Sequence, residues 1–355
     1  MTRFIEFLIS LLIVVVLFVA IGLLLPAKRS FVYSIETNRP MATVNDLLNG
    51  FSRFKDWNSL VRYDPRMKIE VTGPQLGVGA KLSYASRDKV VGDGSWEIVE
   101  SVPGERIVYK LDNNTRGQDK TMTIKLERTG QRNQNVKVTQ EYRVSYGWDL
   151  LGRYAGMYVS RNVGDEMKRS LDKFSGLLAT VPKWDYSQHA GEFAFVDQPA
   201  QDVLLVTTAS KRSNDEIATA MSNQLKWIKK VMDGNGLVAA GPLRIVTNEF
   251  TGDSYGFDVV MPVRKASAPA DAPAGEKLTV KLESQVLYEQ IPARRLATTD
   301  YTGPAPGLPR VRDMLRAWAM TRGADTQDRP FEDYLGGIET MLNEDAKFKV
   351  YWPVK

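Results

Sequence analysis

The stretch Arg329–Lys355 reads RPFEDYLGGIETMLNEDAKFKVYWPVK, and its end repeats an earlier segment of the chain. Phe348–Val354 (FKVYWPV) and Phe257–Val263 (FDVVMPV) share the pattern Phe-x-Val-x-x-Pro-Val. Alternating apolar residues predict a β-strand, and the proline, which lacks an N–H, ends its pairing. Two such strands indicate an internal duplication if the segments that precede them also match.

The preceding segments do match, because each copy closes the order strand, helix, strand, strand. The helix of the first half begins with the capping box Ser213–Glu216, and the helix of the second half begins at Leu308-Pro309. The predicted strands are 202–209, 243–250 and 255–263 in the first half, and 293–301, 331–335 and 347–354 in the second. Residues 201–355 are therefore predicted to form one duplicated α+β domain. An Ala/Pro/Ser-rich loop at 265–276, expected to be disordered, separates the halves.

The chain between residues 30 and 181 shows a different α+β order. A strand at 31–37 precedes two short helices, the first opened by Pro40. Six strand-like runs separated by Gly, Pro and Asn turns then predict an antiparallel meander. A long helix follows at about 148–181, because its apolar residues recur at steps of three and four. These residues are Val163, Met167, Leu171, Phe174, Leu178 and Val181.

This order resembles the START-like, helix-grip fold, and several motifs resemble its polyketide-cyclase-like branch. The motifs are Phe54-Lys55-Asp56-Trp57-Asn58, Gly77-Val78-Gly79-Ala80, Gly94-Ser95-Trp96-Glu97-Ile98 and Pro103-Gly104-Glu105-Arg106-Ile107-Val108-Tyr109. The resemblance implies a curved sheet that grips the long helix, with an apolar cavity between them. We expect the cavity to be lined by Met122, Ile124, Tyr142, Val144 and Tyr158. The alternative for each of these residues is that it simply fills the core.

The duplicated domain resembles the GyrI-like small-molecule-binding domain, which also forms the effector-binding half of multidrug-responsive regulators. The motifs are Ala240-Gly241-Pro242, Phe257-Asp258-Val259, Arg329-Pro330-Phe331-Glu332-Asp333-Tyr334 and Tyr351-Trp352-Pro353-Val354. The resemblance implies a cleft between the two halves and an acid that faces the ligand. That acid is Glu332, with Tyr334 beside it. No DNA-binding region precedes the domain, so direct transcriptional regulation is not expected.

The residues around Glu332 suggest what such a cleft would bind. A carboxylate in an apolar cleft loses hydration, and it can then serve as a cation receptor or a general base. We expect Tyr255, Tyr301 and Trp318 to surround it and to favour a flat or cationic organic ligand through stacking and cation–π contact. In the alternative interpretation, Glu332 lies on a surface strand and pairs with Arg329 or another base.

The N-terminal segment Phe4–Leu25 is almost continuously apolar and matches the roughly twenty residues that cross a bilayer. A cleaved signal peptide is the alternative, but its apolar region is usually about 7–15 residues long. Residues 1–29 are therefore predicted to be a retained, single-pass anchor in a bacterial inner (cytoplasmic) membrane. Basic residues flank both ends, so they decide no orientation. We prefer an inward N-terminus with the soluble domains on the periplasmic side.

The amino-acid composition excludes several kinds of catalytic and metal-binding site. The chain has no cysteine and one histidine, His189, so disulfides, thiol nucleophiles, multi-histidine metal sites and a Ser-His-Asp triad are not expected. No cofactor or metal is predicted. The formal net charge of +5 is small for 355 residues, and a nucleic-acid partner is not expected. Residues 182–200 read as a polar linker in which His189 is solvated.

These features lead to one preferred function and two alternatives. The preferred function is a membrane-anchored protein that binds small hydrophobic or cationic organic molecules, in order to sense or sequester them. The first alternative is an enzyme, either a cyclase or lyase in the START-like cavity or a hydrolase assisted by Glu332. No second acid/base group aimed at the same point stands out, so no catalytic residue is assigned. The second alternative is a stress-response scaffold without a ligand.

Overall fold

The computed structural model describes residues 2–88, 91–269 and 274–355. The chain divides into two compact units, Met1–Lys183 (unit 1) and Trp184–Lys355 (unit 2). Both units mix helices with antiparallel sheets, which confirms the predicted α+β class.

Unit 1 begins with the helix α1 (Thr2–Leu24), which is long and apolar enough to cross a membrane. Its apolar side chains are exposed along its length, for example Leu12 and Val14. Because a core helix of a soluble protein would bury such residues, α1 is not part of the packed core of unit 1.

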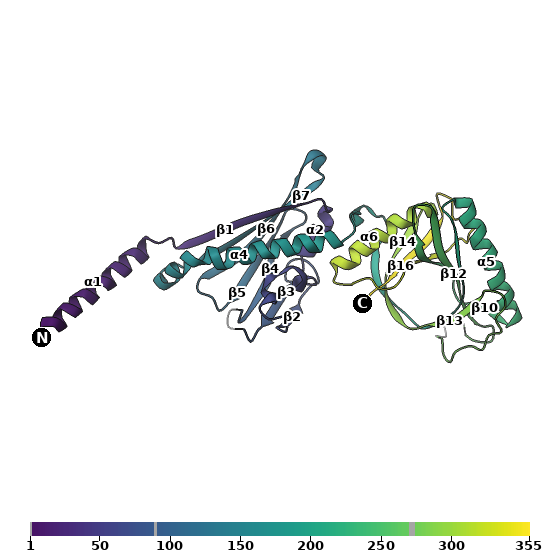
Figure 1. Ribbon diagram of the computed structural model, residues 1–355, viewed down its shortest axis with the longest axis horizontal. Helices are drawn as coiled ribbons and strands as arrows, with labels where there is room; N and C mark the ends of the chain where they lie inside the picture. The colour runs from purple at the N-terminus through teal and green to yellow at the C-terminus, as the bar shows by residue number, and fades with distance from the viewer. Residues whose placement is uncertain (1, 89–90, 270–273) are drawn as a thin grey trace. The chain divides into compact units, whose positions relative to one another are not determined.

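The remainder of unit 1 is a seven-stranded antiparallel sheet with one long helix, α4 (Leu150–Thr180), packed along it (Figure 1). The sheet order is β1-β7-β6-β5-β4-β3-β2. The strands are β1 (Lys28–Thr37), β2 (Lys68–Thr72), β3 (Lys81–Ala85), β4 (Asp93–Val102), β5 (Arg106–Asn113), β6 (Gln118–Thr129) and β7 (Asn135–Ser145). Two short helices, α2 (Met41–Leu48) and α3 (Phe54–Trp57), separate β1 from β2. This is the helix-grip arrangement that the sequence predicted.

The core of unit 1 lies between the sheet and α4. Met167, Leu171, Phe174 and Leu178 form the buried stripe of the helix, at the predicted spacing. Beneath them, an aromatic cluster fills the space with edge-to-face contacts, at centroid distances between 5.4 and 6.0 Å. The cluster consists of Phe54, Trp57, Trp96, Tyr109 and Phe174. This half of the inner face is therefore packed solid by its own side chains.

Unit 2 is built from the two predicted strand-helix-strand-strand halves, with β10 (Leu237–Ala239) as an extra strand beside β12. The first half is β9 (Gln201–Lys211), α5 (Asn214–Gly234), β11 (Leu243–Phe250) and β12 (Ser254–Lys265). The second half is β14 (Arg294–Thr302), α6 (Leu308–Thr321), β15 (Phe331–Tyr334) and β16 (Lys347–Pro353). The strand orders β9-β12-β11 and β14-β16-β15 meet at the β11–β15 pair, so the halves are related by an approximate two-fold axis.

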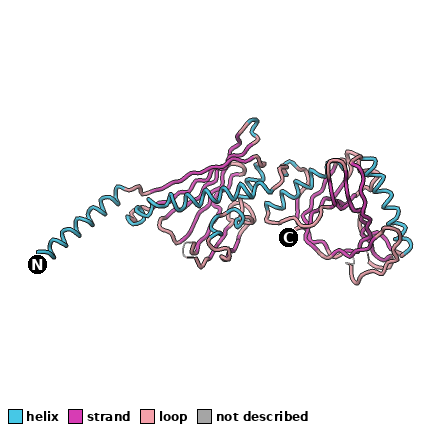
Figure 2. The backbone as a smooth tube through the Cα atoms, in the orientation of Figure 1, coloured by secondary structure: helices cyan, strands magenta, loops and turns pink. Residues whose placement is uncertain are grey.

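Both faces of the central strands of unit 2 are buried. The helices α5 and α6 pack against one face, which carries the main apolar core. All four residues of β15 are nonetheless buried, although alternate residues of a strand point to opposite faces. The sheet is strongly curved, and its strands run round the unit in Figure 2. The curvature explains how the second face, opposite the helices, is also enclosed.

The segment predicted as a polar linker, 182–200, is partly a strand. β8 (Phe193–Gln198) pairs with β14 at the edge of the sheet of unit 2. His189, predicted to be solvated, is half-buried, and its Nε2 lies 2.9 Å from Thr299 Oγ1 and 3.0 Å from Asp300 O. A short strand, β13 (Leu287–Ile291), was also missed and pairs with β9. Residues 270–273 of the predicted disordered loop lie outside the described residues.

Candidate functional site

Glu332, the predicted ligand-facing acid, lies at the centre of unit 2 and is completely buried. It stands opposite Ile245 in the β11–β15 pair, on the face that packs against the helices. Arg312 of α6 points at it and makes a two-pronged ion pair. The Arg312 Nη2 atom donates to Glu332 Oε2 at 2.9 Å, and Arg312 Nε donates to Oε1. This fork geometry satisfies both carboxylate oxygens.

Two of the predicted aromatic residues flank this pair. Tyr255 Oη lies 3.5 Å from Arg312 Nη2 and 3.0 Å from Thr247 Oγ1, and Tyr334 is buried beside Glu332 on the same strand. Burial raises the pKa of both tyrosines, so both hydroxyls stay protonated near neutral pH. Burial alone would lower the pKa of Arg312, but the opposite charge of Glu332 outweighs it and the pKa is raised.

The other two predicted aromatic residues lie elsewhere. Tyr301 stacks on Phe348 and donates a hydrogen bond to Pro304 O at 3.1 Å. Trp318 packs on Phe193 and Phe195 of β8, at centroid distances of 5.5 and 4.7 Å. The structure therefore does not place Trp318 in a cage around Glu332. It lies six residues after Arg312 on α6, about 240° further round the helix, and so faces β8.

The geometry limits what Glu332 can do. Its charge is already neutralised by Arg312, and the pair is sealed in the core. A cationic ligand would have to take the place of the guanidinium, and breaking a buried ion pair costs about 3–5 kcal/mol. Arg312 could not be identified from the sequence, since no local pattern marks one basic residue of an amphipathic helix as a core residue.

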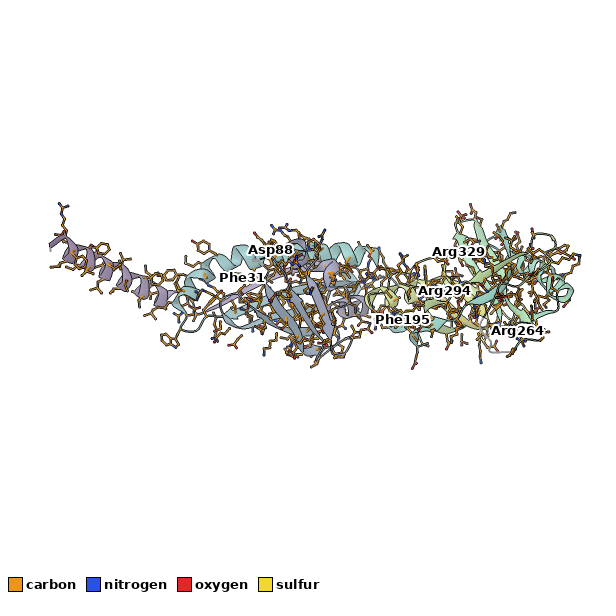
Figure 3. The ribbon with its side chains drawn as sticks, turned by 90° about the horizontal axis from the view of Figure 1, so that it is seen from below. Phe31, Asp88, Phe195, Arg264, Arg294 and Arg329 are labelled. Carbon is orange, nitrogen blue, oxygen red and sulfur yellow. The ribbon has the colours of Figure 1, made fainter. Side chains whose placement is uncertain are left out.

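The opposite face of the same strands carries a second polar network. Arg244 Nε donates to Asp333 Oδ1 at 2.8 Å, and both residues are buried. Arg244 and Arg294 also lie over the ring of Phe331, 4.3 and 5.2 Å from its centroid. Further along this face, Arg329 pairs with Asp258 at 2.8 Å. Arg294 and Arg329 are labelled in Figure 3. The charges in this network are largely paired.

Four of the five residues predicted to line the cavity of unit 1 lie on the inner face of its sheet. Met122 and Ile124 of β6 and Tyr142 and Val144 of β7 are all buried. The fifth prediction is wrong: the side chain of Tyr158 is 68% exposed. The α4 residues that approach the sheet here are Gly152 and Gly156, where an added β-carbon would lie 2.8 Å from the ring of Tyr146. Tyr158, two residues further on, therefore points away from the sheet.

On the outer face of its sheet, away from α4, unit 1 has a hollow of about 410 Å³, whose lining positions alternate with the buried positions of β1, β6 and β7. It is lined by Lys28, Arg29, Ser30, Asp119, Thr121, Arg143, Val144 and Ser145. Two buried polar atoms occur on the other, inner face of the same strands, the Nε of Arg29 and the Oε1 of Gln140. Among the described residues, neither atom has a hydrogen-bond partner. Because a buried unpaired polar group costs about 1–3 kcal/mol, these two atoms are candidates for contact with a ligand.

A further polar cluster joins α4 to the segment after α3. Tyr63 Oη donates to Glu166 Oε1 at 2.7 Å, and Arg169 Nη1 donates to the same oxygen at 2.6 Å. The hydroxyl of Ser170 donates to Ser59 Oγ at 2.9 Å. These bonds anchor the middle of the helix. Within the described part of the chain, no group of His, Asp or Glu residues could hold a metal ion.

Residues 28–178 match the family described as polyketide cyclase / dehydrase and lipid transport. This match covers most of unit 1 and agrees with the START-like resemblance of the sequence. It supports a small-molecule-binding domain in this part of the chain. No curated protein matches the chain.

The chain is similar to several solved structures at low sequence identity. The C-terminal domain of EcmrR has 17% identity and a TM-score of 0.38, and the alignment covers 47% of this chain and 99% of that domain. A hydrolase from Listeria innocua has 13% identity and a TM-score of 0.34, with 46% and 92% covered. A norcoclaurine synthase from Thalictrum, in complex with a transition-state analogue, has 11% identity and a TM-score of 0.34, with 43% and 94% covered.

Proposed function

We propose that this protein is a membrane-anchored binder of small organic molecules, and that unit 1 holds a hydrophobic ligand between its sheet and α4. The match of residues 28–178 to a family of cyclases and lipid-transport proteins carries this proposal. The unpaired atoms of Arg29 and Gln140 support it, since a ligand with one acceptor and one donor would satisfy both. The guanidinium of Arg29, on this inner face, favours an amphiphile with an acidic end.

Gln140→Leu tests this ligand site. The substitution removes an unpaired buried oxygen, so we expect unchanged or higher stability, but binding of a fluorescent fatty acid weakened several-fold. Binding is measured by fluorescence titration of the full chain in nanodiscs, with empty nanodiscs as the blank. Gln118→Leu, on the exposed surface of β6, is the matched control. Wild-type affinity in Gln140→Leu would remove this face from the ligand site.

The anchor is the second part of the proposal. The C-terminal end of α1 is bound into unit 1, because Tyr154 Oη donates to Phe18 O at 2.7 Å and Arg153 Nη1 donates to Leu23 O at 3.0 Å. A signal peptide that is removed would leave both side chains without these partners. We therefore favour a retained single-pass helix in the bacterial inner (cytoplasmic) membrane, with both units on the periplasmic side. Labelling a single cysteine at Lys173 with a membrane-impermeant maleimide in intact cells tests this side.

Unit 2 supplies a second ligand module in this proposal, one for cationic aromatic compounds that displace Arg312 from Glu332. The support is the buried carboxylate flanked by Tyr255 and Tyr334. Tetraphenylphosphonium is the probe. Glu332→Gln should weaken its binding by at least about tenfold, or 1.4 kcal/mol, whereas Arg312→Met should strengthen it, because the competing cation is gone. Equal affinity in all three proteins would make the pair purely structural.

A further inference from the structure

The first turns of α4, together with Trp148 just before the helix, present an unusual set of apolar side chains to solvent. Trp148 is 84% exposed, Leu151 54%, Met157 52% and Tyr158 68%. We call these four residues the apolar collar. Leu151 and Tyr158 lie two helical turns apart on one side of α4. Gly152 and Gly156, on the opposite side, face the sheet. The collar is therefore not covered by unit 1 itself.

The collar is fixed next to the end of α1. The guanidinium of Arg153 donates to three carbonyl oxygens at the C-terminal end of that helix, those of Gly22, Leu23 and Leu25, at 3.0–3.4 Å. The ring of Tyr154 stacks on Phe18 at 4.5 Å with an interplanar angle of 10°. These contacts tie the start of α4 to the last two turns of α1.

The position of Phe18 in α1 gives the distance of this contact from the C-terminal end of the helix. α1 ends at Leu24, six residues later, which corresponds to about 9 Å along a helix that rises 1.5 Å per residue. The apolar length of α1, about 33 Å, closely matches a hydrocarbon core of about 30 Å. When α1 spans the bilayer, Tyr154 therefore lies about 5–10 Å inside the boundary between headgroups and acyl chains. This is the depth that interfacial helices occupy.

We propose that the apolar collar lies in the headgroup–acyl boundary of the leaflet in which α1 ends, so that unit 1 is docked on the bilayer. This inference rests on the proposed anchor. Trp and Tyr favour this depth, because an aromatic body enters the lipid while its polar atom stays hydrated. Lys28 comes four residues after the end of α1, and it lies with Arg29 at the level of the headgroup phosphates.

The absence of cysteine from the chain allows a clean test by site-directed spin labelling. Single cysteines replace Leu151 and Tyr158 in the collar, Lys173 on the exposed side of the same helix, and Val15 within α1. The full chain is reconstituted in phosphatidylcholine nanodiscs, and the relaxation of each label by oxygen and by a water-soluble nickel chelate is measured. We expect the labels at 151 and 158 to show a several-fold higher ratio of oxygen to nickel accessibility than the label at 173. Circular dichroism confirms that each variant is folded.

The labels at Val15 and Lys173 distinguish a failure of the docking inference from a failure of the proposed anchor. If the label at Val15 is in lipid and the labels at 151 and 158 match the one at 173, the collar is in water and the docking inference is overturned while the anchor stands. If the label at Val15 is itself in water, the anchor fails and docking fails with it. A spin label on a cysteine that replaces Trp148 measures the oxygen and nickel accessibility of a third, independent position in the collar.

Discussion

At the scale of single residues, the guanidinium of Arg312 determines the chemistry of Glu332. Both groups are buried, so neither can exchange its partner for water. Arg312 also touches Tyr255, which links α6, β12 and β15 through one cluster. An ion pair in this position contributes little net stability compared with an apolar core, but losing one partner is costly, because the other charge stays buried.

Arg312→Met should therefore lower the free energy of unfolding by about 3–5 kcal/mol, because it leaves Glu332 buried without a counter-charge. The double variant Arg312→Met/Glu332→Met should recover most of this loss, since no unpaired charge remains. Urea unfolding followed by circular dichroism measures both. Lys230→Met, which removes the exposed pair with Glu283, is the control and should change little. A single variant as stable as the wild type would show that Glu332 reaches water.

His189 provides a pH-dependent feature that can be observed in isolation, since it is the only histidine. Burial lowers the pKa of its imidazole, and the cationic Arg310 acts in the same direction, against the opposing effect of the hydrogen bond to Asp300 O. The unfolded chain therefore binds the proton more tightly. The contribution of His189 to the free energy of unfolding is therefore fully present above about pH 6.5 and is lost as the pH falls below that value.

Proton NMR of the His189 ring should thus give a pKa below about 6.5 in the folded chain and close to that value in urea. The free energy of unfolding should fall between pH 7 and pH 5.5, and His189→Asn should show a smaller fall. A folded-state pKa above that of the urea-unfolded protein would contradict the buried environment.

At the scale of elements, α4 contains glycines that do two different things. A β-carbon on Gly156 would lie 2.8 Å from a ring carbon of Tyr146, whereas a β-carbon on Gly176 would have nothing within 4 Å. Gly156 therefore allows the close approach between helix and sheet. Gly176 only adds conformational entropy to the unfolded chain.

Gly176→Ala should stabilise unit 1 by about 0.5–1 kcal/mol, the difference in helix propensity. Gly156→Ala makes the same chemical change in the same helix but should destabilise the unit, because the buried ring of Tyr146 has to move. Thermal unfolding of the two variants in parallel measures the contrast. A gain of stability in both would mean that the helix and the sheet are less tightly packed than the distances indicate.

At the scale of the whole molecule, α1 has an apolar surface that remains exposed, while its last turns are bonded to α4. In the anchor that we propose, lipid covers these side chains and α1 holds the two units at the membrane.

The full chain should stay in the membrane pellet after a wash in alkaline carbonate, and its intact mass should include residues 1–24. A chain that lacks Thr2–Leu24 should be released. The physical reason is the burial of about twenty apolar side chains in lipid, which is effectively irreversible. A mature protein that begins near residue 28 would identify the segment as a cleaved signal peptide.

Much of the fold follows from local patterns. The period of α4, the apolar run of α1 and the repeated Phe-x-Val-x-x-Pro-Val strands are all properties of neighbouring residues, and each predicted the element that the structure contains. The segment 182–200 was misread for the same reason. β8 is short and ends in the polar pair Asp197-Gln198, and it forms a strand by pairing with the edge of β14, about a hundred residues later in the chain.

The order of elements, the duplication in unit 2, the helix-grip order of unit 1 and the apolar N-terminal helix could be predicted from the sequence, because local periodicity and a repeated segment carry them. The folded chain was needed to show that Arg312 neutralises Glu332, that Trp318 packs on β8 and that Tyr158 faces outward. These outcomes depend on which distant residues meet in the folded chain, and the direction of a side chain round a helix is set by that packing rather than by its chemical type.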